Sequence, residues 1–225
     1  MPGERALKVR LRSGRGRRPG STRWLTRQLN DPYVQRAQRE GYRSRSAYKL
    51  LEIDQKFRLL KKGARVLDLG AAPGGWTQVA ARRGCRVVGL DLVPVEPIGG
   101  AELLQGDVFD PEVQQRLEAA LGGRADVLLS DLAAPAVGQR AVDRLRAEGL
   151  GETVLALVPE LLAPGGNMLM KLVRGAETGV AAQARRMFRR VRLLRPDATR
   201  RESSEIYLLG LEYRDDDANP AAPGA

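Results

Sequence analysis

The feature that most constrains the fold is a regular alternation of short apolar runs with helical patterns from residue 64 onward. The apolar runs predict strands at residues 64–70, 85–91, 102–108, 125–131, 167–173, 191–196 and 205–213. Helical patterns predict helices at residues 76–83, 111–121, 142–162 and 178–188. Continuously apolar strands separated by helices form a mostly parallel sheet that is covered on both faces. The sequence therefore predicts an α/β domain with a seven-stranded sheet.

The other segments are read as additions to this one domain. Residues 1–22 are predicted to be a basic disordered arm, and residues 23–62 a helical RNA-binding extension broken near Pro32 and Gly41. The α/β domain then covers residues 63–214, and residues 215–225 are expected to form a disordered tail. No run approaches the roughly 20 apolar residues of a membrane span, and the arginine-rich start is unlike a secretory leader. We expect a cytoplasmic protein that is a monomer and binds no membrane.

Composition excludes several kinds of catalytic site. The chain has no histidine and a single cysteine, Cys85. Ser-His-Asp and Cys-His nucleophile systems are therefore excluded, and no metal site is predicted. Acid and base chemistry is left to Asp, Glu, Lys, Tyr or a cofactor.

The net charge of +11 is concentrated at the start of the chain. Residues 1–49 hold 14 basic and 3 acidic residues, whereas the rest of the chain has 24 of each. Such a segment favours contact with a nucleic acid backbone, and a solubilising tail is the alternative.

The stretch DLGAAPGGWTQ, residues 68–78, predicts a ligand cradle after the first strand. Ligands of open α/β sheets bind beyond the carboxyl ends of the strands. Gly70, Gly74 and Gly75 let the main chain turn and approach a ligand closely. Turn glycines without a ligand are the structural alternative.

The spacing argues against a dinucleotide. The nicotinamide fingerprint is G-x-G-x-x-G, whereas Gly70 to Gly75 read GAAPGG, with only the first and last glycines in place. Asp91 ends the second strand 21 residues after Gly70, where it can accept hydrogen bonds from ribose hydroxyls. Asp107 lies at the end of the third strand, where it can accept from an adenine amino group. The pattern favours an adenosine without a pyrophosphate.

Six ordered motifs carry a resemblance to a known family: DLGAAPGGW, GLDLVP, LLQGDVFD, SDLA, MKLVRG and SSEIYLL. They resemble, over residues 21–213, the FtsJ/RrmJ (RlmE) family of S-adenosylmethionine-dependent ribose 2'-O-methyltransferases. The stretch from Ser21 to Asp54 is similar to the members that modify uridine in 23S ribosomal RNA. The resemblance implies a class I, Rossmann-like methyltransferase fold whose last strand is antiparallel. It also implies S-adenosylmethionine binding by Asp68, Gly70, Gly74, Gly75, Trp76, Asp91, Asp107 and Asp131.

By the same resemblance a Lys-Asp-Lys-Glu tetrad falls on Lys49, Asp131, Lys171 and Glu205. Asp131 and Lys171 also stand out without it, because each lies near the end of an apolar strand, where a charge is costly unless paired or functional. A structural salt bridge is the alternative for this pair. Lys49 alone would be taken for a surface lysine, and Glu205 alone for a solvated strand end.

Methyl transfer from a sulfonium releases a neutral thioether, so the site must supply alignment and help with the proton of the hydroxyl. Two roles are open to Lys171. It can act as a neutral base on the 2'-hydroxyl, or it can stay charged and stabilise the alkoxide while Asp131 takes the proton.

Two surfaces are predicted to bind RNA phosphates. One is the arm and the connector with Tyr42, Arg43 and Arg45, and the other is residues 185–201, with eight arginines and one acid. A solvated helix face is the alternative for the second. Few aromatic residues are available for stacking, so RNA shape is expected to give specificity.

The resemblance implies methylation of one 23S uridine in the A loop, with the 50S subunit preferred over free RNA. One departure is SDLAAPAVG from Ser130, where the family commonly has SDMAPN, and this affects the substrate loop. The alternatives are a 2'-O-methyltransferase of tRNA or cap structures and a catalytically silent ribosome assembly factor. A nicotinamide oxidoreductase fails on the glycine spacing.

Overall fold

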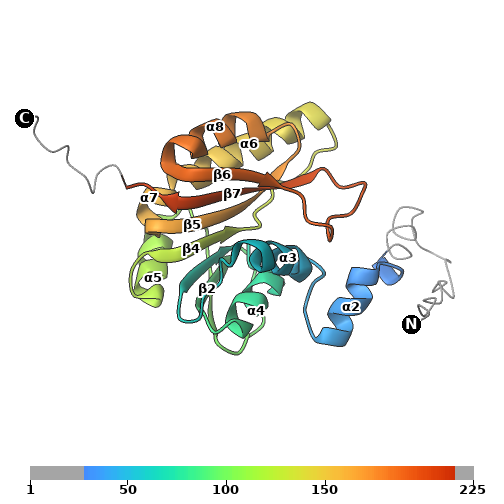
Figure 1. Ribbon diagram of the computed structural model, residues 1–225, viewed down its shortest axis with the longest axis horizontal. Helices are drawn as coiled ribbons and strands as arrows, with labels where there is room; N and C mark the ends of the chain where they lie inside the picture. Colours follow the sequence, from blue (N-terminus) through green and yellow to red (C-terminus); the bar gives the residue numbers. More distant parts are fainter. Residues whose placement is uncertain (1–27, 216–225) are drawn as a thin grey trace, which may run out of the picture.

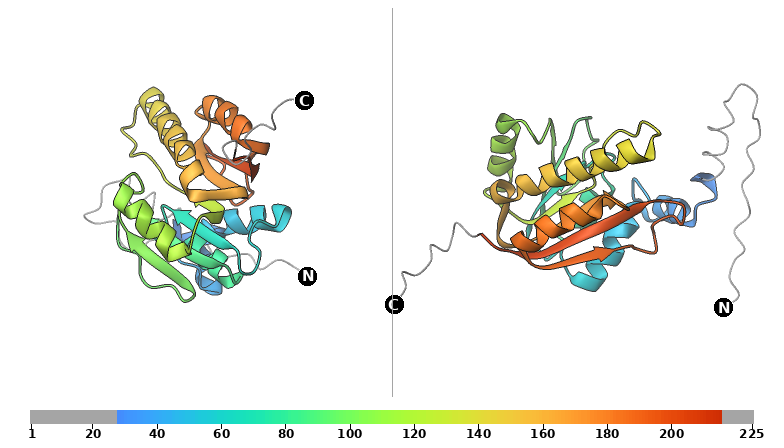
Figure 2. Two further views of the ribbon diagram at one scale, coloured as in Figure 1. Left: turned by 90° about the vertical axis from the view of Figure 1, so that its left-hand side faces the viewer. Right: turned by 90° about the horizontal axis from the view of Figure 1, so that it is seen from above.

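The computed structural model describes residues 28–215, and these form a seven-stranded sheet with helices on both faces (Figures 1 and 2). The strands are β1 (Arg65–Leu69), β2 (Arg86–Asp91), β3 (Ala101–Gln105), β4 (Ala125–Ser130), β5 (Leu162–Val173), β6 (Phe188–Leu194) and β7 (Glu205–Tyr213). The helices are α2 (Pro32–Glu40), α3 (Ala47–Phe57), α4 (Gly75–Arg82), α5 (Pro111–Leu121), α6 (Arg140–Ala156), α7 (Val158–Leu161) and α8 (Glu177–Met187).

The sheet has the strand order β3-β2-β1-β4-β5-β7-β6. Neighbours from β3 to β5 pair in parallel, and β7 is antiparallel to both β5 and β6. The predicted class I methyltransferase fold, with its last strand antiparallel, is confirmed. The carboxyl ends of β1, β2, β4 and β5 meet at one edge of the sheet.

Two apolar layers cover the sheet. Helices α5, α6 and α8 pack on one face through residues such as Leu117, Leu155 and Val180. Helices α3 and α4 pack on the other face, where Leu50 and Trp76 lie in the core. The helix α3 therefore shares a core with the sheet.

The structure differs from the predicted elements around Pro159. The predicted helix 142–162 is two helices, α6 and α7, and Leu162 already begins β5. The break falls at Leu157, and Pro159 lies in the first turn of α7, where its missing N–H is tolerated but cannot continue the hydrogen bonds of α6.

The structure describes neither end of the chain completely. The predicted arm, residues 1–22, and residues 216–225 of the predicted tail are outside the described residues. Asp215, the first residue of that tail, forms an ion pair of 3.2 Å with Arg124. Within residues 28–215, no helix is long and apolar enough to span a membrane.

Candidate active site

The glycine turn after β1 is shaped by the end of β4. Gly70 has a φ of +78°, and a Cβ there would lie 3.0 Å from the main-chain nitrogen of Leu132 and 3.2 Å from the carbonyl carbon of Asp131. Both the positive φ and the closeness of two main-chain atoms favour glycine. The turn is thereby held against the strand end that carries Asp131.

The second half of the turn is covered by the connector between α2 and α3. A Cβ on Gly75 would lie 2.2 Å from Ser44 Oγ, so a larger residue there would displace the Ser44 side chain of the connector. Trp76 is buried, and its indole nitrogen donates to the carbonyl of Ser46 at 3.0 Å. The Trp76 ring packs 5.9 Å from the Tyr207 ring, so it faces the core beneath the turn.

Asp68 is a carboxyl group that is completely buried under the turn. One oxygen accepts a hydrogen bond of 2.6 Å from Thr77 Oγ1, and the other has no partner among the described residues. Burial, with added repulsion from Asp131 and Asp91, raises the pKa of Asp68 to about 7, although the Thr77 hydrogen bond opposes the rise.

This raised pKa predicts a pH-dependent cost to stability. An unfolded Asp loses its proton near pH 4, whereas Asp68 in the folded chain keeps it until about pH 7. The folded state therefore binds more protons within this window, and stability falls as the pH rises, by at most about 4 kcal/mol. Asp68→Asn, which resembles the protonated acid, should remove this fall.

The measurement is the free energy of urea unfolding of both proteins at pH 4.5 and pH 7.5. We expect the wild type to lose stability relative to Asp68→Asn between these pH values. A difference between the two proteins that is equal at both pH values would contradict the assignment.

A cavity of about 270 Å³ opens beside the turn and is lined by three of the predicted cofactor-binding residues, Gly70, Asp91 and Asp107. Asp91 accepts hydrogen bonds from the backbone nitrogens of Ala72 and Val93, at 2.9 and 3.1 Å. Asp107 accepts from the backbone nitrogen of Phe109 at 3.0 Å. Each carboxylate keeps lone pairs for a ligand, because it has about four acceptor sites.

The walls of this cavity suit a flat ring. Leu92 and Phe109 also line it and are unusually exposed, at 66% and 41% of their surface. Apolar side chains that face a cavity can cover an aromatic ring, and nearby acids can accept from ribose hydroxyls and an amino group. The residues present therefore fit an adenosine, with Gly70 at the end of the cavity nearest Asp131.

The four tetrad residues form two ion pairs, and none of the four lines this cavity, although Leu132, the residue after Asp131, does. Lys171 Nζ lies 2.8 Å from Asp131 Oδ1 and donates a hydrogen bond of 2.6 Å to the carbonyl of the same residue. Lys49 Nζ lies 2.6 Å from Glu205 Oε2. The side chains are 14% and 22% exposed in the first pair and 9% and 32% in the second. The structure thus brings together residues that lie far apart in the sequence.

The charge of Lys171 in the first pair also affects the pKa of Glu205 in the second pair. Burial alone would raise the pKa of Glu205, but the charge and hydrogen bond of Lys49, with the charge of Lys171, lower it below its usual value.

The Tyr207 hydroxyl is buried and lacks a partner among residues 28–215. Burial, and the negative charges of Asp131 and Glu205, raise its pKa far above the usual value. Tyr207 was not predicted as a site residue, because an aromatic residue within an apolar strand gives no signal of function.

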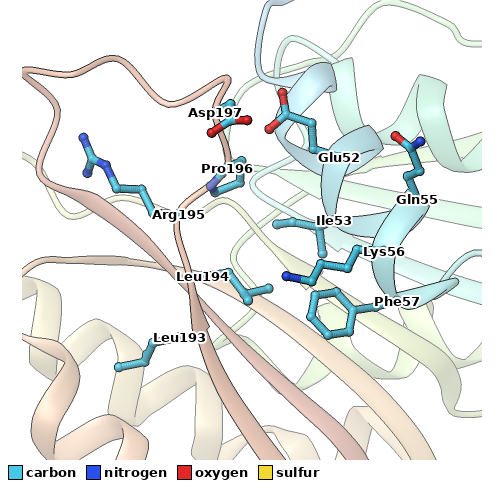
Figure 3. Close-up of a pocket in the computed structure, with 10 residues that line it drawn as sticks. All are labelled: Glu52, Ile53, Gln55, Lys56, Phe57, Leu193, Leu194, Arg195, Pro196 and Asp197. Atoms are coloured by element: carbon cyan, nitrogen blue, oxygen red, sulfur yellow. The ribbon is translucent and has the colours of Figure 1, made fainter.

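Other hollows lie further from the adenosine cavity. One of about 300 Å³ adjoins the second ion pair and is lined by Gln28, Arg45, Lys49, Arg200, Glu202, Ser203 and Glu205. A groove of about 680 Å³ separates α3 from β6 and contains none of the predicted site residues (Figure 3). In the described part of the chain, no group of three or more Cys, Asp or Glu is placed to hold a metal ion.

Several arginines predicted to bind RNA make hydrogen bonds or ion pairs with other parts of the protein. Arg43 donates to the carbonyls of Pro73, Glu96 and Pro97, which fastens the connector to the glycine turn. Arg45, Arg195 and Arg200 are also engaged in internal contacts. Of the eight arginines in residues 185–201, the exposed ones without a hydrogen-bond or ion-pair partner among the described residues are Arg185, Arg186, Arg189, Arg192 and Arg201.

The comparisons with known proteins agree with the geometry. Residues 42–213 match the family described as FtsJ-like methyltransferase. The chain is 47% identical to a ribosomal RNA large subunit methyltransferase E of Gluconobacter oxydans, over 96% of this chain and 82% of the relative. It is 50% identical to the protein of the same name from Acidiphilium cryptum, over 94% and 95%.

A solved structure shares the fold. A ribosomal RNA methyltransferase from Plasmodium falciparum superimposes with a TM-score of 0.69 at 30% identity, covering 76% of this chain and 98% of that one. The resemblance found in the sequence motifs is confirmed. FtsJ-like methyltransferases use S-adenosylmethionine, and this chain belongs to the FtsJ-like methyltransferase family.

Proposed function

We propose that this protein transfers a methyl group from S-adenosylmethionine to the ribose 2'-hydroxyl of one uridine in 23S ribosomal RNA. The observation that carries the proposal is the pair of short contacts, Lys171–Asp131 and Lys49–Glu205, with Asp131 directly before Leu132 in the wall of the adenosine cavity. Charged pairs that are largely removed from water are expensive to build and are concentrated at catalytic sites.

The cofactor supplies an electrophilic methyl on a positively charged sulfur. The protein's part is to hold the ribose in line with that methyl and to manage one proton. An ammonium has three N–H donors, and one from Lys171 is donated to the carbonyl of Asp131, while the ammonium lies 2.8 Å from the carboxylate of the same residue. Another N–H can bind the 2'-oxygen and stabilise the charge that develops there. Asp131 is then placed to take the proton.

Two features support ribosomal RNA as the substrate. The relatives described above carry large-subunit ribosomal RNA in their names. Exposed arginines at the end of α8 and along β6, including Arg185, Arg189 and Arg192, suit sequence-independent contact with phosphates. We propose action in the cytoplasm on the 50S subunit, by a monomer.

The loop after β4 departs from the common family sequence at Ala134, Pro135 and Ala136. In the structure Ala134 and Pro135 line the adenosine cavity, while Ala136 lines a neighbouring cavity of about 220 Å³ that includes Lys171. The departure therefore lies at the boundary of these two cavities, where Ala134 lines both of them, and it does not change Asp131.

The test is transfer of labelled methyl to 50S subunits lacking the modification, compared with free 23S RNA and tRNA. We expect incorporation into 50S at one uridine, mapped by primer extension, and a rate that falls steeply with added salt. Preferential labelling of tRNA would favour the other 2'-O-methyltransferase activity. Cofactor binding without transfer to any RNA would favour a silent assembly factor.

A further inference from the structure

Asp31 joins three separate segments of the chain. Its side chain is 7% exposed, and its Oδ2 lies 2.9 Å from Arg45 Nη1 and 2.9 Å from Arg200 Nε. Its Oδ1 accepts from the backbone nitrogen of Tyr33 at 3.0 Å and so caps α2. Arg45 belongs to the connector before α3, and Arg200 belongs to the loop of residues 195–204 between β6 and β7. We call Asp31, Arg45 and Arg200 the Asp31 clamp.

The same loop is held to α3 by further hydrogen bonds. Glu52 of α3 accepts from the backbone nitrogen of Ala198, at 3.1 and 3.2 Å, and Arg45 donates to the carbonyl of Ala198. Figure 3 shows Glu52 pointing toward the loop at Pro196 and Asp197. Ala198 is completely buried. The tip of this arginine-rich loop is therefore packed into the protein.

Arg195 connects the later residues of the loop to one another through hydrogen bonds. Its guanidinium donates to the carbonyls of Arg200, Arg201, Ser203 and Glu205. A displacement of Arg200 would therefore be passed along the loop to Glu205, where β7 begins.

The Asp31 clamp joins the two segments that carry the members of the second ion pair. Glu205 follows the loop directly, and Lys49 lies four residues after Arg45, in the first turn of α3. Their side chains meet at 2.6 Å. One carboxylate thus ties the segment that carries Lys49 to the segment that carries Glu205.

We propose that Asp31 is a positioning residue that sets the Lys49–Glu205 pair for methyl transfer, and that Arg45 and Arg200 serve this clamp instead of RNA phosphates. The proposal rests on the function proposed above. Without the Asp31 charge, two guanidinium groups would face each other in a half-buried site, and repulsion would drive the loop and Glu205 away from α3.

The test is Asp31→Asn, because asparagine still caps α2 but carries no charge. A shift of about 1 Å at a catalytic group can cost about 100-fold in rate, so we expect kcat to fall by about 10- to 100-fold. The KM for 50S subunits, the salt dependence of RNA binding and the affinity for S-adenosylmethionine should stay at wild-type values. Hydrogen–deuterium exchange in residues 196–204 should become faster.

Two further variants test whether a loss of activity in Asp31→Asn comes from the clamp or from the helix cap. Asp110→Asn changes the equivalent cap of α5, far from the clamp in the sequence, and should leave kcat and loop exchange unchanged. Arg200→Gln should also lower kcat without changing the KM for RNA. Because Arg200→Gln removes the repulsion, adding it to Asp31→Asn should lower kcat no further and should recover part of the loss.

Three results would overturn the proposal: wild-type kcat in folded Asp31→Asn, a raised KM for RNA with a weaker salt dependence in Arg200→Gln, or unchanged loop exchange in Asp31→Asn. The second result would make Arg200 a phosphate contact. The exchange measurement needs no RNA, so it tests the clamp even if the wild type proves inactive on 23S RNA and the proposed function fails.

Discussion

Lys171→Ala is expected to lower the rate of methyl transfer by about 100- to 10,000-fold, the range typical of a positioned proton-handling group. Lys171 is the tetrad member that forms an ion pair with the carboxylate of Asp131 and donates a hydrogen bond to the carbonyl of the same residue. Its removal takes away the donor to the 2'-oxygen and releases Asp131 from its place. The measurement is a single-turnover rate with saturating cofactor and 50S subunits.

Cofactor affinity separates this effect from a general loss of structure. Lys171 does not line the adenosine cavity, so Lys171→Ala should bind S-adenosylmethionine within about threefold of the wild type, because it loses no cofactor hydrogen bond of the 1.5–3 kcal/mol class. Lys56→Ala is the matched control, since Lys56 is an exposed lysine on α3 outside the tetrad. A wild-type transfer rate in Lys171→Ala would show that Lys171 is a structural ion-pair partner.

Asp91→Ala is expected to weaken S-adenosylmethionine binding by about 10- to 100-fold, since a hydrogen bond to a charged group contributes about 1.5–3 kcal/mol. The carboxylate lies in the adenosine cavity with free lone pairs for ribose hydroxyls. It also holds the backbone nitrogen of Ala72, so its loss loosens the glycine turn as well. Calorimetric titration of the cofactor into both proteins measures the change.

The control for Asp91 is another acid with the same backbone contact. Asp110 accepts from the backbone nitrogen of Glu112 at 2.9 Å but does not line the cavity. Asp110→Ala should therefore bind the cofactor as the wild type does. If Asp91→Ala also keeps wild-type affinity, Asp91 is a turn-forming residue and the ribose lies elsewhere.

The parts of the site that the sequence could predict are those built at strand ends. Asp131 and Lys171 each interrupt an apolar run, and parallel neighbours place their carboxyl ends together. Their contact of 2.8 Å follows from that geometry. Lys49 could be named only through the family resemblance, because its partner, Glu205, lies more than 150 residues away. No local pattern encodes a contact of that range.

Charge alone could not show which arginines make contacts within the protein. The runs that contain Arg43, Arg45, Arg195 and Arg200 read as RNA-binding surfaces, and in the structure these side chains also donate to carbonyls or pair with Asp31. An arginine has five donors that suit a carbonyl as well as a phosphate. Only the packing of the loop against α2 and α3 decides between these partners.

Mass spectrometry of nucleosides from RNA treated with the wild type and with Lys171→Ala tests the central claim most directly. The 50S subunits lacking the modification would be incubated with S-adenosylmethionine, and their 23S RNA digested to nucleosides. We predict one new 2'-O-methyluridine per 23S RNA with the wild type, its added mass on the ribose fragment, and almost none with the variant. A methyl on the base fragment, or equal product from both proteins, would contradict the account.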